Sequence, residues 1–276
     1  MGRQAALVNK RQHTAVPRTQ KIRPLFPLCY ESDMKTVILG DIHGRTVWRD
    51  ILEKENPDRI IFLGDYVSTH EGIRPKQQIT NLREIMERKE DESERFILLR
   101  GNHDMQHLGY HWAECSGPVY EVMRFMGDPE FRERFLEWTQ WVYEMKTEDR
   151  TILFSHAGVS QVWMDNNGIQ DVGDINALEP SERFSFTPDT PWDGDGDSVT
   201  QPCTWIRPDA LLKAAIPGYT QVVGHTPLKV DLPTELKTGK TQDAIWLCDT
   251  LHVPSYLILE DGIFRPEKLD GSAKNS

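Results

Sequence analysis

The sequence has no long hydrophobic run and no closely spaced pair of cysteines. None of its apolar stretches approaches the roughly 20 residues that a membrane-spanning helix needs, and its N-terminal region lacks the apolar core of a secretory signal. The four cysteines, Cys29, Cys115, Cys203 and Cys248, are widely separated and form no C-x-x-C unit, which argues against a zinc knuckle or a redox pair. We therefore expect a cytoplasmic protein with reduced thiols and no membrane partner.

Positive charge is scarce over most of the 276 residues, whose formal net charge is −11. The exception is the first 30 residues, which carry six Lys or Arg and no acid, whereas the remainder carries 26 basic and 43 acidic residues. Such a basic arm could bind nucleic acid or anionic lipid, but its charges are dispersed and interrupted by Pro17, Pro24 and Pro27. We expect residues 1–33 to form a solvated, poorly ordered extension, and we do not expect nucleic acid as a partner.

Short apolar runs and helical patterns alternate through the chain, which predicts an α/β fold. Apolar residues at three- and four-residue spacing lie between the earlier runs, as at Ile79, Leu82 and Ile85, and predict crossover helices. The runs indicate strands of two sheets, and they are "TVILG" from 36, "RIIFLG" from 59, "RFILLRG" from 95, "TILFSH" from 151, "QVVGH" from 221, "AIWLC" from 244 and "SYLILEDG" from 255.

Residues 105–146 differ from this alternation. The stretch "FRERFLEWTQWVYEM" places Phe131, Phe135, Trp138, Val142 and Met145 on one face of a helix, with no strand between them. We expect a helical cap or insertion over 105–146. Residues 160–203 are rich in Asp, Gly and Pro, and they are expected to form long loops.

Polar residues follow five of the apolar runs directly, usually beside a glycine. Asp65 comes after "RIIFLG", and the other four segments are "GDIHG" from 40, "GNHD" from 101, "SHAG" from 155 and "GHT" from 224. If the runs are strands, their ends meet at one edge of the sheets, where open α/β folds bind ligands. The residues collected there are Asp41, His43, Asp65, Asn102, His103, His156 and His225.

Oxygen and imidazole donors without a thiolate favour manganese, iron, zinc or magnesium. A carboxylate has two oxygens, so Asp65 could bridge two cations about 3.5 to 4 Å apart. Two other interpretations are open for single residues: Asp41 could cap the following helix, and any one histidine could be a hydrogen-bonded core residue. Five such segments in order favour a metal site.

These segments resemble the motifs of the calcineurin-like metallophosphoesterases, closest in style to the phosphoprotein phosphatases and their bacterial and phage relatives. That family has the pattern GD-x-HG, GD-x-V-D-R-G, GNH-[ED], H-[AG]-G and GH, and this chain has "GDIHG", "GDYV", "RGNHD", "SHAG" and "VVGHT". The resemblance covers about residues 36 to 265. It implies a four-layer α/β/β/α sandwich of two mixed sheets flanked by helices, in a catalytic domain over residues 34–276.

The resemblance also implies roles for single residues. A first metal would be held by Asp41, His43 and Asp65, and a second metal by Asp65, Asn102, His156 and His225. A water between the two metals would attack phosphorus in line. His103 would protonate the leaving oxygen, and Arg100 and Arg207 would contact the phosphate. The expected cofactors are two divalent ions, with manganese favoured over iron, zinc and magnesium.

The family pattern is incomplete after "GDYV", where Ser68, Thr69 and His70 stand in place of Asp, Arg and Gly. The missing Asp would orient the catalytic histidine, and the missing Arg would hold the phosphate. Candidate replacements are Asp104 or Glu71 for the first, and His70 or Arg74 for the second.

The expected function is hydrolysis of phosphomonoesters, with phosphoserine or phosphothreonine as candidate groups on the substrate. The stretch "GNHDMQHL" also resembles the symmetrical diadenosine tetraphosphate hydrolases, so a nucleotide hydrolase or phosphodiesterase is the alternative. A third interpretation, a binding module without activity, is disfavoured because every proposed ligand is present. The expected partner is a phosphorylated protein or a small phosphate ester or nucleotide.

Overall fold

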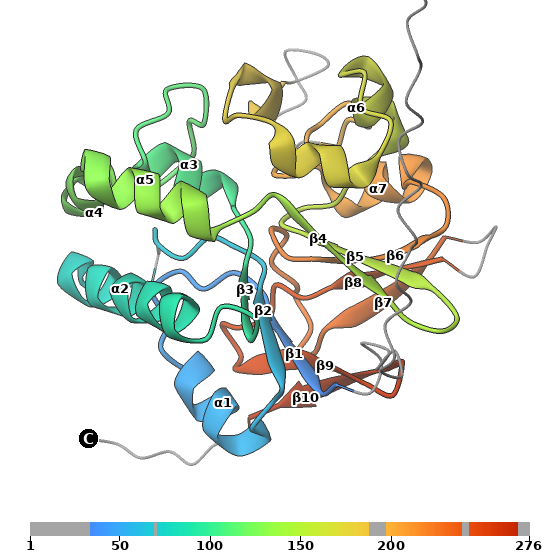
Figure 1. The fold of residues 1–276 in the computed structure, drawn as a ribbon, viewed down its shortest axis with the longest axis horizontal. Coiled ribbons are helices and arrows are strands. Elements are labelled where there is room, and N and C mark those ends of the chain that lie inside the picture. Colours follow the sequence, from blue (N-terminus) through green and yellow to red (C-terminus); the bar gives the residue numbers. More distant parts are fainter. Residues whose placement is uncertain (1–33, 69–70, 188–196, 239–242, 270–276) are drawn as a thin grey trace, which may run out of the picture.

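The computed structural model describes residues 34–68, 71–187, 197–238 and 243–269 (Figure 1). The predicted basic extension, residues 1–33, and the candidate residue His70 lie outside this range. Two five-stranded sheets face each other. Their strand orders are β10-β9-β1-β2-β3 and β4-β5-β6-β8-β7.

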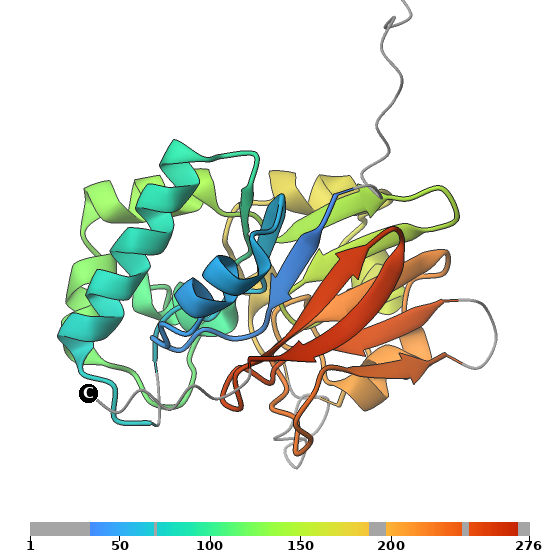
Figure 2. The same cartoon turned by 90° about the horizontal axis from the view of Figure 1, so that it is seen from below.

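Both sheets are mixed, as predicted. The first combines β1 (Thr36–Leu39), β2 (Arg59–Phe62) and β3 (Phe96–Leu98), which are parallel, with antiparallel β9 (Ser255–Glu260) and β10 (Ile263–Lys268). The second combines β5 (Thr151–Ser155), β6 (Tyr219–Val223) and β8 (Ala244–Leu247), which are parallel, with antiparallel edge strands β4 (Val142–Lys146) and β7 (Thr234–Lys237). Figure 2 shows β9 and β10, in red, beside blue β1.

The central strands are buried on both faces, which is why they are rich in apolar residues. In β1, Ile38 faces the second sheet and joins an apolar cluster with Phe154 of β5 and Val222 of β6. Its neighbours Val37 and Leu39 point the other way, toward the helices. Successive side chains of a strand alternate between faces, so one apolar strand serves two cores.

Helices cover the outer face of each sheet, so the predicted α/β/β/α layers are confirmed (Figure 1). The first sheet is covered by α1 (Trp48–Glu55) and α2 (Pro75–Asp91), and the second by α6 (Gln161–Asn166) and α7 (Pro208–Ala214). The remaining helical segments are α3 (Asn102–His107), α4 (Tyr120–Met126), α5 (Pro129–Trp138) and the 3₁₀ helices η2 (Val172–Ala177) and η3 (Glu182–Phe184). Within the described residues, no helix is long and apolar enough to cross a membrane.

The predicted helical insertion is correct only in its first part. Helices α4 and α5 pack against α2, but α5 ends at Trp138, and Val142 and Met145 lie in strand β4. The helical interpretation of these two residues was wrong because Thr139 is already extended, at φ −115° and ψ 157°. The long loops expected over 160–203 were also wrong in part, since α6, η2 and η3 lie there.

Candidate metal centre

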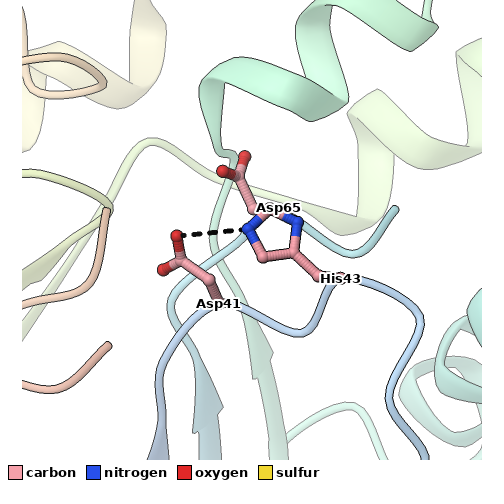
Figure 3. A group of neighbouring side chains, drawn as sticks. All are labelled: Asp41, His43 and Asp65. Carbon is pink, nitrogen blue, oxygen red and sulfur yellow. Dashed lines mark ion pairs between the residues drawn. The ribbon is translucent and has the colours of Figure 1, made fainter. Parts of the chain in front are cut away.

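The loops that follow β1 and β2 bring three predicted ligands together (Figure 3). Asp41, His43 and Asp65 each offer one donor atom, and these atoms all lie within 4.8 Å of one another. Nε2 of His43 is 3.8 Å from Oδ2 of Asp41. This spacing suits a single cation surrounded by two carboxylates and an imidazole.

Backbone contacts between the two loops fix this cluster. The N–H of His43 donates to the carbonyl of Asp65 at 2.7 Å, and the N–H of Gly44 donates to the carbonyl of Tyr66 at 2.8 Å. The backbones of His43 and Asp65 have positive φ angles, 46° and 51°, which side-chain-bearing residues rarely adopt. The loops therefore hold both side chains in a conformation that neither residue would choose alone.

Two further donors lie beside Asp65, one from a loop of each sheet. His156 follows β5, and its Nε2 lies 2.9 Å from Oδ1 of Asn102 and 3.4 Å from Oδ2 of Asp65. Asn102 is the first residue of α3. The Asp65 carboxylate thus lies between the two groups of predicted ligands, which is the position required of a bridging residue.

The hydrogen bond at the far side of the His156 ring decides what its Nε2 offers. Nδ1 lies 2.8 Å from the carbonyl oxygen of Leu63, and a carbonyl only accepts, so Nδ1 carries the proton. Burial lowers the pKa of His156, which favours the neutral ring with a lone pair on Nε2. This lone pair faces the amide oxygen of Asn102 and the carboxylate of Asp65, and a divalent cation could bind all three groups.

His225 lies just after the end of β6, next to Asp41 and His156. Its N–H donates to Oδ1 of Asp41 at 2.8 Å, and its ring centre is 5.0 Å from that of His156. Its Nε2 is buried and has no hydrogen-bond partner among the residues that the structure describes. A buried polar atom without a partner is costly in a protein, and a metal ion would supply the partner.

Burial dominates the electrostatics of the two carboxylates. It raises the pKa of Asp41 to about 7 and that of Asp65 well above its ordinary value. The negative charge of Asp65 raises the pKa of Asp41 further. Divalent cations between these carboxylates would favour their ionised forms, so the donor set fits two such ions.

Two glycines leave room for these carboxylates. A Cβ at Gly101 would lie 2.0 Å from Oδ1 of Asp65, and a Cβ at Gly224 would lie 2.3 Å from Oδ1 of Asp41. Any larger residue would displace the carboxylate. Glycine is therefore required at both positions by close approach.

Asp104, predicted as a partner that orients the catalytic histidine, has a different position. Its Oδ2 accepts from the N–H groups of Asp65 and Gly101 at 2.9 and 2.8 Å, and its Oδ1 accepts from the N–H of Tyr66 at 2.9 Å. The side chain is fully buried beneath the loop after β2. These contacts make Asp104 a support for the Asp65 backbone and do not place it in the cleft.

Arg100 also lies away from the predicted phosphate. Its guanidinium donates to the carbonyls of Leu136 and Thr139 at 2.6 and 2.7 Å and to Oγ1 of Thr139 at 3.0 Å. It stacks over the ring of Trp141, 4.8 Å from its centre. The geometry thus disagrees with the phosphate contact expected from the sequence, because these donors are directed at the end of α5.

Five of the six proposed ligands line a cleft of about 430 Å³, and they are Asp41, His43, Asp65, Asn102 and His225. His103 lines this cleft too, with its ring edge-on to His43 at 5.4 Å, and its backbone N–H donates to Oδ1 of Asp65 at 3.0 Å. Arg207 is a further lining residue, and its Nη1 donates to the carbonyl of His225 at 3.0 Å and to Oγ1 of Thr226 at 3.1 Å. A histidine and an arginine therefore both lie in the cleft beside the cluster.

Residues of the segment in which the family pattern is incomplete lie in or near the cleft. The hydroxyl of Ser68 donates to the carbonyl of Gly117 at 2.9 Å. Glu71 forms an ion pair with Arg45 at 2.5 Å, and both residues line the cleft. Arg74 precedes α2 and is not among the lining residues. Arg45 is therefore a cleft cation that the sequence analysis did not consider.

Other lining residues were missed as well. They include Cys115, Ser116, Trp205, Asp249 and His252. For Asp249 the sequence held a usable signal, because Asp249 follows the apolar run "AIWLC" as Asp41 follows "TVILG". The others come from loops with no regular pattern.

Comparison with known proteins places these observations in context. The family model of the calcineurin-like phosphoesterases matches residues 34–246. The cold-active protein-tyrosine phosphatase of a psychrophilic Shewanella species is similar in structure, with a TM-score of 0.55 and 18% identity over 84% of this chain and 80% of that chain. A Saccharomyces cerevisiae protein serine/threonine phosphatase, described as similar to human PP5, gives a TM-score of 0.54 and 13% identity over 88% and 82%. A search of curated proteins found no significant match.

Proposed function

This chain belongs to the calcineurin-like phosphoesterase family, and on that basis we propose that it is a dinuclear metal-dependent phosphatase acting on phosphomonoesters. The observation that carries the proposal is the convergence of imidazole, amide and carboxylate groups around Asp65. His156 Nε2 lies 2.9 Å from Asn102 Oδ1 and 3.4 Å from Asp65 Oδ2. These are groups that coordinate divalent cations, and one cation could bind all three.

In this proposal Asp41, His43 and Asp65 hold one cation, and Asp65, Asn102, His156 and His225 hold the other. Manganese suits these oxygen and imidazole donors, as do iron, zinc and magnesium. When bound, such a pair of cations supplies Lewis acidity and a water of lowered pKa. Two divalent cations against two carboxylates would leave about two positive charges, which attract a phosphate dianion into an otherwise acidic protein.

The chain's own side chains have three tasks. Arg207 binds phosphate oxygens, because a guanidinium matches their geometry and this one lines the cleft. His103 gives its proton to the leaving oxygen of the ester, since its ring lies beside the His43 side of the cluster. Asp104 accepts from the N–H groups of Asp65, Tyr66 and Gly101, and so holds the loop that carries the Asp65 carboxylate in position.

A phosphomonoester on a protein side chain is the substrate class we favour. Arg45 and Arg207 both line the cleft beside the proposed cations, which suits a doubly charged terminal phosphate. The two structural neighbours are named as protein phosphatases, one for tyrosine and one for serine and threonine. Their names support a phosphoprotein substrate without choosing among the three side chains.

A panel of substrates tests the proposal. Metal-free protein with added Mn²⁺ would be assayed on p-nitrophenyl phosphate, its bis-ester, phosphoserine, phosphothreonine and phosphotyrosine peptides, and diadenosine tetraphosphate, with a chelated sample as blank. We expect the monoesters to be hydrolysed and the chelated sample to be inactive. Preference for the bis-ester or for diadenosine tetraphosphate would replace this proposal with the phosphodiesterase or nucleotide hydrolase alternative.

A further inference from the structure

A third aspartate, Asp249, lies in the same cleft as Asp41 and Asp65, and it is not one of the proposed ligands or catalytic residues. It follows β8 and lines the cleft with only 4% of its surface exposed. Its Oδ2 has no hydrogen-bond partner among the described residues. A carboxylate oxygen that is buried and unpaired is strongly unfavourable, so its presence calls for a partner outside the protein chain.

The backbone of Cys248 and Asp249 packs closely against Gly40, which precedes Asp41. A Cβ at Gly40 would lie 2.2 Å from the carbonyl oxygen of Cys248 and 2.9 Å from Cα of Asp249. On its other side, the N–H of Cys248 donates to the carbonyl of Val223 in β6 at 2.7 Å. The end of β8 is thus fixed between the loop that carries Asp41 and the strand that leads to His225.

The two arginines that line the same cleft hydrogen-bond other groups. Arg45 forms its ion pair with Glu71 at 2.5 Å and donates to the carbonyl of Asp41 at 3.1 Å. Arg207 donates to the carbonyl of His225 and to Oγ1 of Thr226. Among the described residues neither guanidinium donates to Oδ2 of Asp249, so a cation in the cleft would give this carboxylate a further countercharge.

Asp249 is not part of the compact cluster of Asp41, His43 and Asp65, whose donor atoms lie within 4.8 Å of one another. Its charge can still act from outside that cluster, because charges in a buried site interact strongly over several ångströms. Residues around a metal centre that do not coordinate the metal often raise its affinity about 10- to 100-fold.

We propose that Asp249 is a third carboxylate of the metal centre, which strengthens the binding of the cation beside Asp41 through its negative charge and not by direct coordination. The inference rests on the proposed function, since it requires the two-cation centre. It also changes the charge balance, because three carboxylates and two divalent cations leave about one positive charge in place of two. Asp249 would thus be a positioning residue for a cation.

Titration calorimetry with Mn²⁺ tests this role without an activity assay. Full-length protein freed of metal would be compared with its Asp249→Asn variant and with Asp174→Asn as a matched control, because Asp174 is an exposed acid in η2. We expect wild type to bind two Mn²⁺ ions. Asp249→Asn should weaken one site by roughly 10- to 100-fold and leave the other unchanged. Asp174→Asn should match wild type.

The melting temperature of the chelated proteins separates this role from a purely structural one. Asp249→Asn removes a buried carboxylate whose Oδ2 has no hydrogen-bond partner among the described residues, so the chelated variant should melt at the same temperature as chelated wild type or higher. A lower melting temperature together with equal weakening of both sites would overturn the inference in favour of a role in folding. If Asp249→Asn left both Mn²⁺ sites unchanged, the role of Asp249 would be overturned and the proposed function would stand. If the wild-type protein bound no Mn²⁺, both the role of Asp249 and the proposed function would be overturned.

Discussion

Three of the proposed ligands occupy a backbone region that residues with side chains rarely adopt. The φ angles are 46° for His43, 51° for Asp65 and 64° for His225. Such conformations are unfavourable, and they persist where surrounding contacts impose them, commonly at functional sites. Here the contacts include the hydrogen bond from the N–H of His225 to Asp41. The donors are therefore oriented by the fold before any cation binds.

The role of His103 can be tested by its amide variant. His103→Asn should slow hydrolysis of an alkyl phosphate by roughly 10²- to 10⁴-fold, because the leaving alkoxide then receives no proton. The effect on p-nitrophenyl phosphate should be smaller, since nitrophenolate is a better leaving group. Rates would be measured at saturating Mn²⁺ with the metal content determined in parallel. Equal rates in both proteins would refute the proton transfer.

Arg207 and Arg100 form a matched pair of substitutions. Arg207→Gln should raise KM for a monoester with little effect on stability, because the side chain lines the cleft. Arg100→Gln should leave KM unchanged and lower the free energy of unfolding by about 2 kcal/mol, because hydrogen bonds from its guanidinium to buried carbonyls are lost. Steady-state kinetics and urea unfolding would decide. A raised KM for Arg100→Gln would restore the phosphate contact expected from the sequence.

The stability of the metal-free protein should depend on pH through Asp41. Burial raises the pKa of Asp41 to about 7, whereas in the unfolded chain it is about 4. Between these values the folded state holds a proton that the unfolded state has released, so stability falls as pH rises from about 4 to 7. Urea unfolding in EDTA should show a steeper fall for wild type than for Asp41→Asn. Parallel curves would contradict the shift.

At the scale of elements, the strand ends determine how closely the loops approach. A Cβ at Gly224 would lie 2.3 Å from Oδ1 of Asp41. We expect Gly224→Ala to displace this carboxylate and weaken Mn²⁺ binding by at least about 10-fold, comparable to the loss of a supporting contact. Gly173→Ala is the control, because its Cβ would meet only Oδ1 of Asp171 at 3.1 Å. Calorimetry should show normal affinity for the control, and normal affinity for both variants would contradict the close approach.

The sequence predicted the central strands well because they are buried on both faces and rich in apolar residues. The antiparallel edge strands β4, β7 and β10 lack this signal. Residues Thr234–Lys237 of β7 are nowhere fully buried, and β10 contains Pro266, which is tolerated at a sheet edge. In β4 the buried residues Val142 and Met145 are three apart, a spacing that is typical of a helix and misled the prediction.

The same contrast holds for the site. Six predicted ligands meet because each follows a strand whose end was recognisable. The positions of Asp104 and Arg100 could not be predicted, because an acid that accepts three backbone N–H groups and an arginine directed at the end of α5 have no sequence pattern. Asp249 was missed although its placement after an apolar run is the same as that of Asp41.

At the scale of the whole molecule, the candidate centre is shared between loops of the two sheets. Asp41 and Asp65 come from loops of the first sheet, and His156 and His225 from loops of the second. Buried carboxylates and lone pairs from both sheets face one another there, so the metal-free protein holds repulsive contacts at the junction. Bound cations would turn those contacts into links between the sheets, and they would stabilise the folded state by mass action.

Anomalous diffraction from crystals grown with Mn²⁺ is the most direct test of the two-cation centre. We predict two anomalous peaks about 3.5 to 4 Å apart, with the Asp65 carboxylate between them. One peak should lie beside Asp41 and His43, and the other beside Asn102 and His156. A single peak, or none among these side chains at saturating Mn²⁺, would contradict the proposed centre.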